Sequence, residues 1–464
     1  MKTIGRAAAT LLLSLFGCVA LVAPAWAFCG FYVSKADASL YNQASQVIIA
    51  RDGDRTVLTM ANDYQGEVKD FALVVPVPVV LEEEQVHVGE PEIIERLDTF
   101  SAPRLVEYFD HNPCDPVALP APMPQAPGAA RGTANEALEF DDAESLGVTI
   151  ESQFSVGEYD ILILSARESE GLETWLRQND YRLPENASRL LQPYIRDGLK
   201  FFVARVNLEE FEDGDFQRLR PLMMAYESSR FMLPIRLGTM NATEAQDLIV
   251  YLLSPRGQVE LTNYRTVRIP SDEELPEFVE DEFGDFYKAM FTHSYDREGK
   301  RAAFLEYAWD MAWCDPCAAN PLTPEELRQA GVFWLNNLRP QPGQPRRLPA
   351  QPGPQNVFIT RLHVRYTRDR FPEDLRFQQT ANRENFQGRY IIRRPYRGEM
   401  ECAAADPYRQ QVRDRQAREA ETLASLTGWR LSDIRRKIDT LPTPEDPRPW
   451  WQDLWSGRGR LNPG

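Results

Sequence analysis

Short apolar runs separated by turn residues predict a β-hairpin early in the chain. Gln46–Ala50 and Thr56–Met60 are rich in β-branched and apolar side chains, and Asp52-Gly53 lies between them. An Asp-Gly pair between two such runs is the strongest short-range signal for a hairpin. The next run, Phe71–Val75, predicts a buried strand that ends at Pro76, because proline has no N–H to donate to a neighbouring strand.

Helical spacing begins after these strands. Behind Pro91, which suits a first helical turn, Ile93, Ile94, Leu97 and Phe100 recur at helical intervals. The same spacing predicts helices over residues 171–177, 184–196, 406–427 and 431–441, the third starting at Asp406-Pro407 and stopping at Gly428. Further strand-like runs are Val148–Phe154, Tyr159–Leu164, Phe201–Val206, Leu222–Tyr226, Phe231–Arg236, Leu248–Leu253, Val259–Ile269 and Val357–Tyr366.

Shifts in composition predict the domain organisation. Two stretches are rich in proline and poor in residues that can pack, so we expect linkers or surface loops there. An acidic stretch, Asp272–Asp285, leads out of the central segment. The mixture of strands and helices predicts the α+β class. The expected organisation is residues 1–27 as a signal peptide, 28–114 as a β-rich N-terminal module, 115–146 as a Pro/Ala-rich linker or loop, 147–338 as a mixed α+β module, 339–355 as a Pro-rich loop and 356–464 as a C-terminal strand and helical segment.

The N-terminus predicts export. Lys2 and Arg6 flank an apolar run, and Ala25-Trp26-Ala27 has the small-x-small pattern of a cleavage site. These are the parts of a secretory signal peptide, so we expect the mature chain to begin near Phe28 and to be periplasmic or secreted. A lipoprotein, modified at Cys18, is the alternative, but Cys18 lies inside the apolar run and a better cleavage site follows.

The composition of the mature chain limits the classes of partner that it can bind. Removal of two basic residues and no acidic ones moves the formal charge from −17 to about −19. An acidic surface repels phosphate backbones, so we expect no nucleic acid partner. No apolar stretch after the signal peptide approaches the roughly 18 residues that span a bilayer, so we expect no transmembrane helix after cleavage. We expect an envelope or extracellular partner of unknown identity.

One motif carries recognisable chemistry. Trp313-Cys314-Asp315-Pro316-Cys317 resembles the active site of thioredoxin-like oxidoreductases, and Phe304–Trp309 has the pattern of the strand that precedes such a site. However, Pro321 and Pro324 follow closely, so the long helix that this fold requires cannot start at Cys314. A structural disulfide or an inert loop therefore stands beside a catalytic dithiol as an interpretation.

Five cysteines remain after cleavage, namely Cys29, Cys114, Cys314, Cys317 and Cys402. Because the number is odd, at least one is left over, and the sequence does not determine how the others pair. From segment membership we expect Cys29 to pair with Cys114, and Cys402 to pair with Cys314 or Cys317. In an oxidising compartment we expect Cys114 to be bridged rather than to act as a nucleophile with His111.

Other catalytic and metal-binding patterns are missing from the sequence. The four histidines, His87, His111, His293 and His363, are isolated, and neither H-E-x-x-H nor G-x-S-x-G occurs. Asp52-Gly53-Asp54 and Asp213-Gly214-Asp215 are not followed by a complete calcium loop, so turns are the favoured interpretation. We therefore expect no metal and no cofactor.

Several short motifs are similar to one bacterial family. Phe28-Cys29-Gly30-Phe31-Tyr32, Asp63-Tyr64-Gln65-Gly66, Val74-Val75-Pro76-Val77-Pro78, Asn263-Tyr264-Arg265 and the Trp313–Cys317 motif resemble secreted proteins of the domain-of-unknown-function family 2330. The resemblance extends over most of the mature chain. It implies a secreted or surface location and carries no catalytic residues.

These observations predict a non-enzymatic binding or cell-envelope-associated protein. A periplasmic thiol-disulfide oxidoreductase, with Cys314 as nucleophile and Cys317 as resolving thiol, is the first alternative. An extracytoplasmic hydrolase whose residues come from distant segments is the second.

Overall fold

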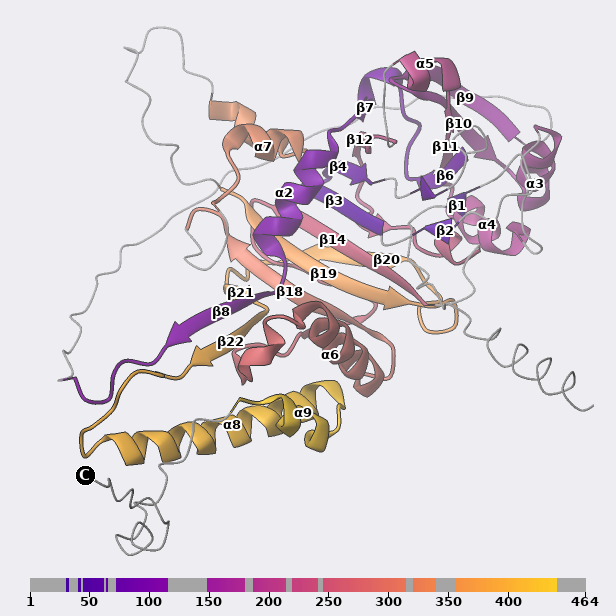
Figure 1. Cartoon of the computed structure of the whole chain (residues 1–464). Coiled ribbons are helices and arrows are strands. Elements are labelled where there is room, and N and C mark those ends of the chain that lie inside the picture. Colours follow the sequence, from indigo (N-terminus) through magenta and orange to yellow (C-terminus); the bar gives the residue numbers. More distant parts are fainter. Residues whose placement is uncertain are drawn as a thin grey trace, which may run out of the picture.

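The computed structural model describes residues 31–32, 41–42, 45–61, 64–65, 72–115, 148–179, 187–213, 219–240, 245–313, 320–338 and 356–439. Over these residues the chain has the expected α+β structure (Figure 1). Two sheets share one apolar core, and helices cover their outer faces.

The largest sheet contains nine strands, in the order β16-β18-β19-β14-β3-β4-β12-β7 with β21 beside β18. Its neighbours are antiparallel except at the β14–β3 and β16–β18 pairs, which are parallel. The strands are β3 (Ser45–Asp52), β4 (Arg55–Met60), β7 (Val86–Val88), β12 (Leu222–Glu227), β14 (Gln246–Ser254), β16 (Arg265–Arg268), β18 (Ala302–Asp310), β19 (Phe358–Tyr366) and β21 (Phe386–Gln387). This sheet takes strands from all three expected modules, whose boundaries stay a prediction.

The predicted hairpin is confirmed as the β3–β4 pair. Asp52 faces Arg55 across the pair, which leaves a two-residue loop. Gly53 has φ +60° at the first position of that loop, the place where a type II′ turn requires glycine. The Asp-Gly signal was therefore right about the hairpin, although glycine occupies the first central position of the turn.

The second sheet is antiparallel, with the order β1-β6-β11-β10-β9. Its strands are β1 (Phe31–Tyr32), β6 (Ala72–Val77), β9 (Val148–Val156), β10 (Tyr159–Ala166) and β11 (Lys200–Val206). The expectation that the strand predicted over Phe71–Val75 ends at Pro76 is wrong, because β6 continues through Pro76, opposite Phe201 of β11. On the other side β1 pairs only with Leu73 and Val74, so its pairing does not extend to Pro76.

Three smaller sheets complete the strand architecture. The first is β13-β20-β15, the second is the all-parallel β17-β22-β8, and the third is the pair β2-β5. Their strands are β2 (Tyr41–Asn42), β5 (Tyr64–Gln65), β8 (Arg104–Phe109), β13 (Met232–Leu233), β15 (Val259–Leu261), β17 (Glu273–Leu275), β20 (Leu375–Gln379) and β22 (Arg389–Arg394).

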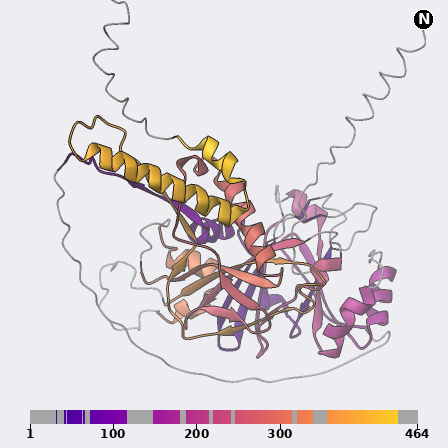
Figure 2. The same cartoon turned by 90° about the horizontal axis from the view of Figure 1, so that it is seen from below.

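Helices cover the sheets in separate groups. In Figure 1, α2 and α6 lie over the large sheet and α3 and α4 lie over the second sheet. Seen from below, α8 lies lengthwise along the small sheet formed by β17, β22 and β8 (Figure 2). The α-helices are α2 (Pro91–Ser101), α3 (Ser169–Gln178), α4 (Ala187–Arg196), α5 (Leu208–Asp213), α6 (Phe283–Arg297), α7 (Pro324–Gln329), α8 (Ala405–Thr427) and α9 (Leu431–Lys437), and the 3-10 turns are η2 (Glu83–Gln85), η3 (Leu237–Met240), η4 (Glu277–Val279) and η5 (Phe333–Leu338).

Two local predictions need correction. The helix expected to begin at Asp406-Pro407 begins at Ala405, so both residues lie in its first turn, and Gly428 ends it with φ +74° as expected. The acidic stretch Asp272–Asp285 does not merely lead out of the central segment. It supplies β17, η4 and the first turn of α6, because its interspersed apolar residues, such as Leu275 and Val279, are buried.

Candidate functional site

A row of cationic side chains lies on one face of the large sheet. Arg361, His363 and Arg365 alternate along β19, so their side chains point to the same face. That face is covered by α2 and α6 (Figure 1). Three cations in a strand that is otherwise apolar need anionic partners, because burial of an unpaired charge is strongly unfavourable.

Glu306 of β18 supplies the central anion. The β18–β19 register shifts between Leu305 and Tyr307, so Glu306 is the extra residue of a β-bulge. Bulges redirect a side chain from the regular alternation of a strand. Here the carboxylate is 1% exposed and accepts hydrogen bonds from Arg361 Nε at 2.6 Å, from His363 Nδ1 at 2.8 Å and from the Tyr287 hydroxyl of α6.

Asp247 of β14 binds the other side of the histidine. Its carboxylate lies 3.2 Å from His363 Nε2 and accepts two hydrogen bonds from Arg365, at 2.7 and 2.8 Å. Phe291 of α6 stacks on the imidazole with a ring-centre distance of 3.7 Å. Both ring nitrogens of His363 thus face carboxylates, an arrangement that the doubly protonated imidazolium satisfies best.

Arg361 extends the network to α2. Its Nη1 donates to Asp98 at 2.6 Å and lies 3.3 Å from the Tyr251 hydroxyl of β14. The same hydroxyl donates to Asp98 at 2.8 Å and accepts from Gln46 Nε2 of β3 at 3.1 Å. The result is a continuous network, here called the buried network because Glu306, Arg361 and His363 at its centre are buried, whereas Asp98 at its edge is 40% exposed. Its members are Asp98, Asp247, Tyr251, Tyr287, Glu306, Arg361, His363 and Arg365.

The electrostatics of the buried network are balanced. Burial alone would raise the pKa of Glu306, but the charges of His363 and Arg361, together with the hydrogen bonds from His363 and Tyr287, outweigh it and lower that pKa to about 2. Burial likewise opposes a charged His363, yet Glu306 and Asp247 raise the pKa of the imidazole above its ordinary value. Three carboxylates therefore face two guanidinium groups and one imidazolium.

This arrangement favours a structural role. A general base or nucleophile must reach a substrate, and here every acid and base is bonded to another member of the network. An open groove of about 510 Å³ lies elsewhere, between η4, α6 and α9, and is lined by Phe278, Glu282, Asp285, Gly428, Trp429, Arg430, Asp433, Ile434 and Lys437. None of these residues belongs to the buried network, so the network and the groove are separate features.

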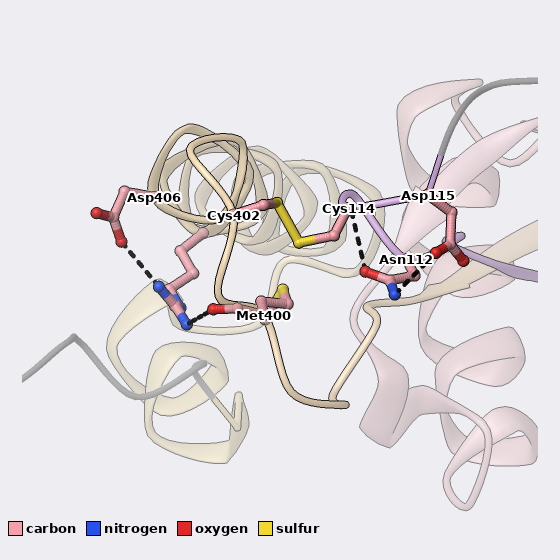
Figure 3. The surroundings of a disulfide bond; sticks show 7 residues. Asn112, Cys114, Asp115, Met400, Cys402 and Asp406 are labelled. Carbon is pink, nitrogen blue, oxygen red and sulfur yellow. Dashed lines mark hydrogen bonds and ion pairs between the residues drawn. A yellow bond between two sulfur atoms is a disulfide. The ribbon is translucent and has the colours of Figure 1, made fainter.

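The cysteines expected at the site are placed differently. Cys114 and Cys402 form a disulfide with a Cα–Cα distance of 5.7 Å across 288 positions of sequence (Figure 3). The expected pairs of Cys29 with Cys114, and of Cys402 with Cys314 or Cys317, are therefore wrong. Segment membership failed because the pairing is decided by the sheet: β8 lies parallel to β22 and brings the loops that follow both strands together. Cys29, Cys314 and Cys317 lie outside the described residues, as do the cleavage site and Cys18.

The loop around the disulfide is held by local hydrogen bonds. The Asn112 side chain accepts from the Cys114 backbone N–H at 3.0 Å and donates to Asp115 at 3.3 Å (Figure 3). On the other side, Asp406 of α8 accepts from Arg409 at 2.8 Å. Because its sulfur is bonded, Cys114 cannot serve as a nucleophile for His111.

The four histidines differ in what surrounds them. His87 is exposed on β7 and His111 is exposed near the disulfide, whereas His293 of α6 lies beside Gly428. His363 alone belongs to the buried network, and sequence reasoning missed it because its partners come from distant strands. The available signal was the alternation Arg361, His363, Arg365 inside a buried run. Among the residues that the structure describes, no three His, Cys, Asp or Glu side chains are grouped to hold a metal ion.

Comparison with known proteins places this α+β chain, closed by a long-range disulfide, in a family. The profile of the bacterial domain-of-unknown-function family 2330, described as an uncharacterized protein conserved in bacteria, matches residues 23–378. The chain belongs to this family, since the match covers well over half of its 464 residues. No match was found among curated proteins or among solved structures. Elements β21, β22, α8 and α9 lie beyond the matched region.

Within the described ranges, no helix combines the length and the apolarity needed to cross a bilayer.

Proposed function

We propose that the protein is exported and acts as a non-enzymatic binding or cell-envelope-associated protein, periplasmic or secreted. The Cys114–Cys402 disulfide carries this proposal. Disulfides persist in oxidising compartments and are rare where glutathione keeps thiols reduced. The N-terminal pattern of Lys2, the apolar run and Ala25-Trp26-Ala27 supports the same compartment.

The assignment as non-enzymatic rests on the buried network. A hydrolase needs a concave site with converging titratable groups, as the second alternative supposes. The acids and bases of the network are instead bonded to each other, and Glu306, Arg361 and His363 at its centre are buried. We therefore favour a role in which the protein presents a rigid surface to an envelope or extracellular partner.

Differential alkylation of protein from fractionated cells tests the proposal. We expect an envelope or extracellular fraction in which the chain begins near Phe28, with Cys114 and Cys402 protected until a reductant is added. The C402S variant is the matched control, because it should leave Cys114 free to react. A full-length chain that begins at Met1, with reactive Cys114, found only in the cytoplasm would contradict the proposal.

A thiol-disulfide oxidoreductase is the second candidate. Strand β18 ends at Asp310, and Trp313, which immediately precedes Cys314, is 58% exposed, so this end of the motif is accessible. Reduction of insulin by the purified protein would test the candidate, with C314S as the variant that should abolish it. Equal rates for both proteins would exclude catalysis by this dithiol.

A further inference from the structure

Helix α8 covers the small parallel sheet with a face that is only partly apolar. The residues of α8 that are buried recur at helical spacing, as a docked helix requires. They are Ala405, Val412, Arg415, Gln416, Glu419, Ala420, Leu423 and Thr427. Three polar residues thus occupy the middle of the buried face, where apolar side chains are expected.

Two of these polar residues have partners. Arg415 Nη2 donates to Asp110 at 2.9 Å, and Asp110 also accepts from the Tyr408 hydroxyl at 2.8 Å. Gln416 Nε2 donates to the backbone carbonyl of Asp439 at 3.0 Å. These contacts attach α8 to the loop after β8 and to the chain that follows α9.

Glu419 is different. Its side chain is 5% exposed, and its Oε1 finds no hydrogen-bond donor within the described part of the chain. Arg415 Nε lies 3.4 Å away but is likewise left without a hydrogen bond. A carboxylate in this position would lose its hydration and gain little in return, whereas a neutral carboxyl group would not.

The surroundings of Glu419 add like charges. The charged groups that face it are Arg415 of α8, Glu274 of β17, Glu277 of η4 and Arg393 of β22. Arg393 already binds Glu274 at 2.9 Å, and Glu277 is bound by Arg397 at 3.1 Å, so these cations are engaged elsewhere. Burial first, and the two glutamates after it, raise the pKa of Glu419 to about 7 although Arg415 opposes the rise.

We propose that α8 is a pH-sensitive arm whose docking on β17 and β22 depends on a protonated Glu419. The Cys114–Cys402 disulfide keeps the start of α8 attached to the loop after β8 when the rest of the helix loosens. Under the helix lie apolar residues of α6 and β22, among them Phe286 and Tyr390, which pack in one cluster with Ala420 and Leu423. Opening of the arm therefore exposes an apolar surface at neutral pH that is covered in acid.

The direction of the pH effect follows from the linkage between protonation of Glu419 and docking of α8. The docked helix binds the Glu419 proton more tightly than the open helix, where an ordinary glutamate titrates near about 4.3. Docking is therefore strongest below that value, weakens as the pH rises through the window up to about 7, and changes no further above it. Across this window the opening equilibrium should increase roughly a hundredfold, because the slope of about tenfold per pH unit flattens at both ends of the window.

Hydrogen exchange of α8 tests the arm. Exchange of peptides within residues 405–427, corrected for the intrinsic pH dependence, should accelerate roughly a hundredfold between pH 4.5 and 7.5 in the wild type. In E419Q it should be independent of pH. The matched control is E421Q, because Glu421 lies on the same helix with its side chain 64% exposed, and it should behave as the wild type. Peptides of β14 serve as an internal reference for global unfolding.

Two outcomes would overturn the proposal. One is an E419Q protein whose α8 peptides follow the wild-type pH profile. The other needs no variant and covers the case in which E419Q fails to fold: a carbon-detected NMR titration of the wild-type Glu419 carboxyl. A midpoint near the ordinary glutamate value would show that the buried carboxyl does not retain its proton.

Discussion

His363 joins the two halves of the buried network, since one ring nitrogen faces Glu306 and the other faces Asp247. Buried ion pairs are weak evidence for net stabilisation, because desolvation offsets much of the attraction. Removal of one partner is another matter, because it leaves the remaining charges buried without compensation. The consequence of losing His363 can therefore be predicted in sign and in size.

The H363A variant should be less stable than the wild type by about 3 kcal/mol, through the uncompensated Glu306 and the lost stacking on Phe291. Urea unfolding followed by circular dichroism measures the difference. His87 is exposed on β7, so H87A is the matched control and should change the free energy of unfolding by less than about 0.5 kcal/mol. Equal stabilities for H363A and H87A would show that the network contributes nothing.

The same histidine predicts a pH dependence. Because its folded pKa is raised, its contribution is fully present below the ordinary value of about 6.5 and is lost as the pH rises through the higher folded pKa. The stability difference between the wild type and H363Q should therefore be larger at pH 6 than at pH 9. A difference that stays constant over this range would mean that folding does not raise the pKa of His363.

At the scale of the element, substitutions at two glycines with left-handed backbone distinguish the cost of conformational strain from the cost of a steric clash. Gly53 in the β3–β4 turn has φ +60°, and a Cβ added there would meet nothing within 4 Å. Gly331, after α7, has φ +89°, and an added Cβ would lie 2.7 Å from Val57 of β4. G53A should cost about 1 kcal/mol, the strain of the turn alone. G331A should cost more, because it adds a clash in a packed core.

Thermal unfolding of both glycine variants measures this contrast. If G53A proved as damaging as G331A, the turn rather than the core contact would limit the stability of the hairpin. The double variant G331A/V57A removes Val57 Cγ1, the nearest atom at 2.7 Å, but keeps Cβ at 2.9 Å, so it should recover only part of the loss.

The elements that sequence analysis found are those with local signals. The β3–β4 hairpin, α2 and α8 each combine an apolar period with a turn or cap residue. Helix α6 was not predicted, because Phe286, Met290 and Phe291 are separated by charged and aromatic residues and follow an acidic run. Strand β22 was missed too, since its short apolar run, Tyr390–Ile392, is flanked on both sides by arginines whose acidic partners lie elsewhere in the sequence.

At the scale of the whole molecule, long-range pairing decided what the sequence could not show. The parallel pairs β3–β14 and β8–β22 join segments that are far apart along the chain, and no local pattern indicates which strands will meet. The buried network depends on the pairing of β19 with β14 and β18, and the disulfide depends on the β8–β22 pair. The sequence could thus predict that disulfides form, but it could not predict which cysteines pair.

The disulfide also makes a prediction about the folded chain as a whole. Cys114 and Cys402 close a loop of 288 positions, and such a cross-link stabilises mainly by restricting the unfolded chain. We expect the C114S/C402S variant to lose about 2–5 kcal/mol in urea unfolding. An unchanged free energy would mean that the unfolded chain is not restricted by this bridge.

The location of the loss should be as informative as its size. Both cysteines lie at the end of the β8–β22 pair, close to the start of α8, so removal of the bridge should free the arm before it affects the core (Figure 3). In hydrogen exchange, peptides within residues 405–427 should therefore accelerate more than those of β14, whose residues are buried on both faces of the large sheet. Equal acceleration in both would assign the disulfide to global stability alone. If loss of the disulfide accelerates exchange in α8 more than in β14, and E419Q at the same pH does not, then the covalent attachment of the arm and its proton-dependent docking are separate effects.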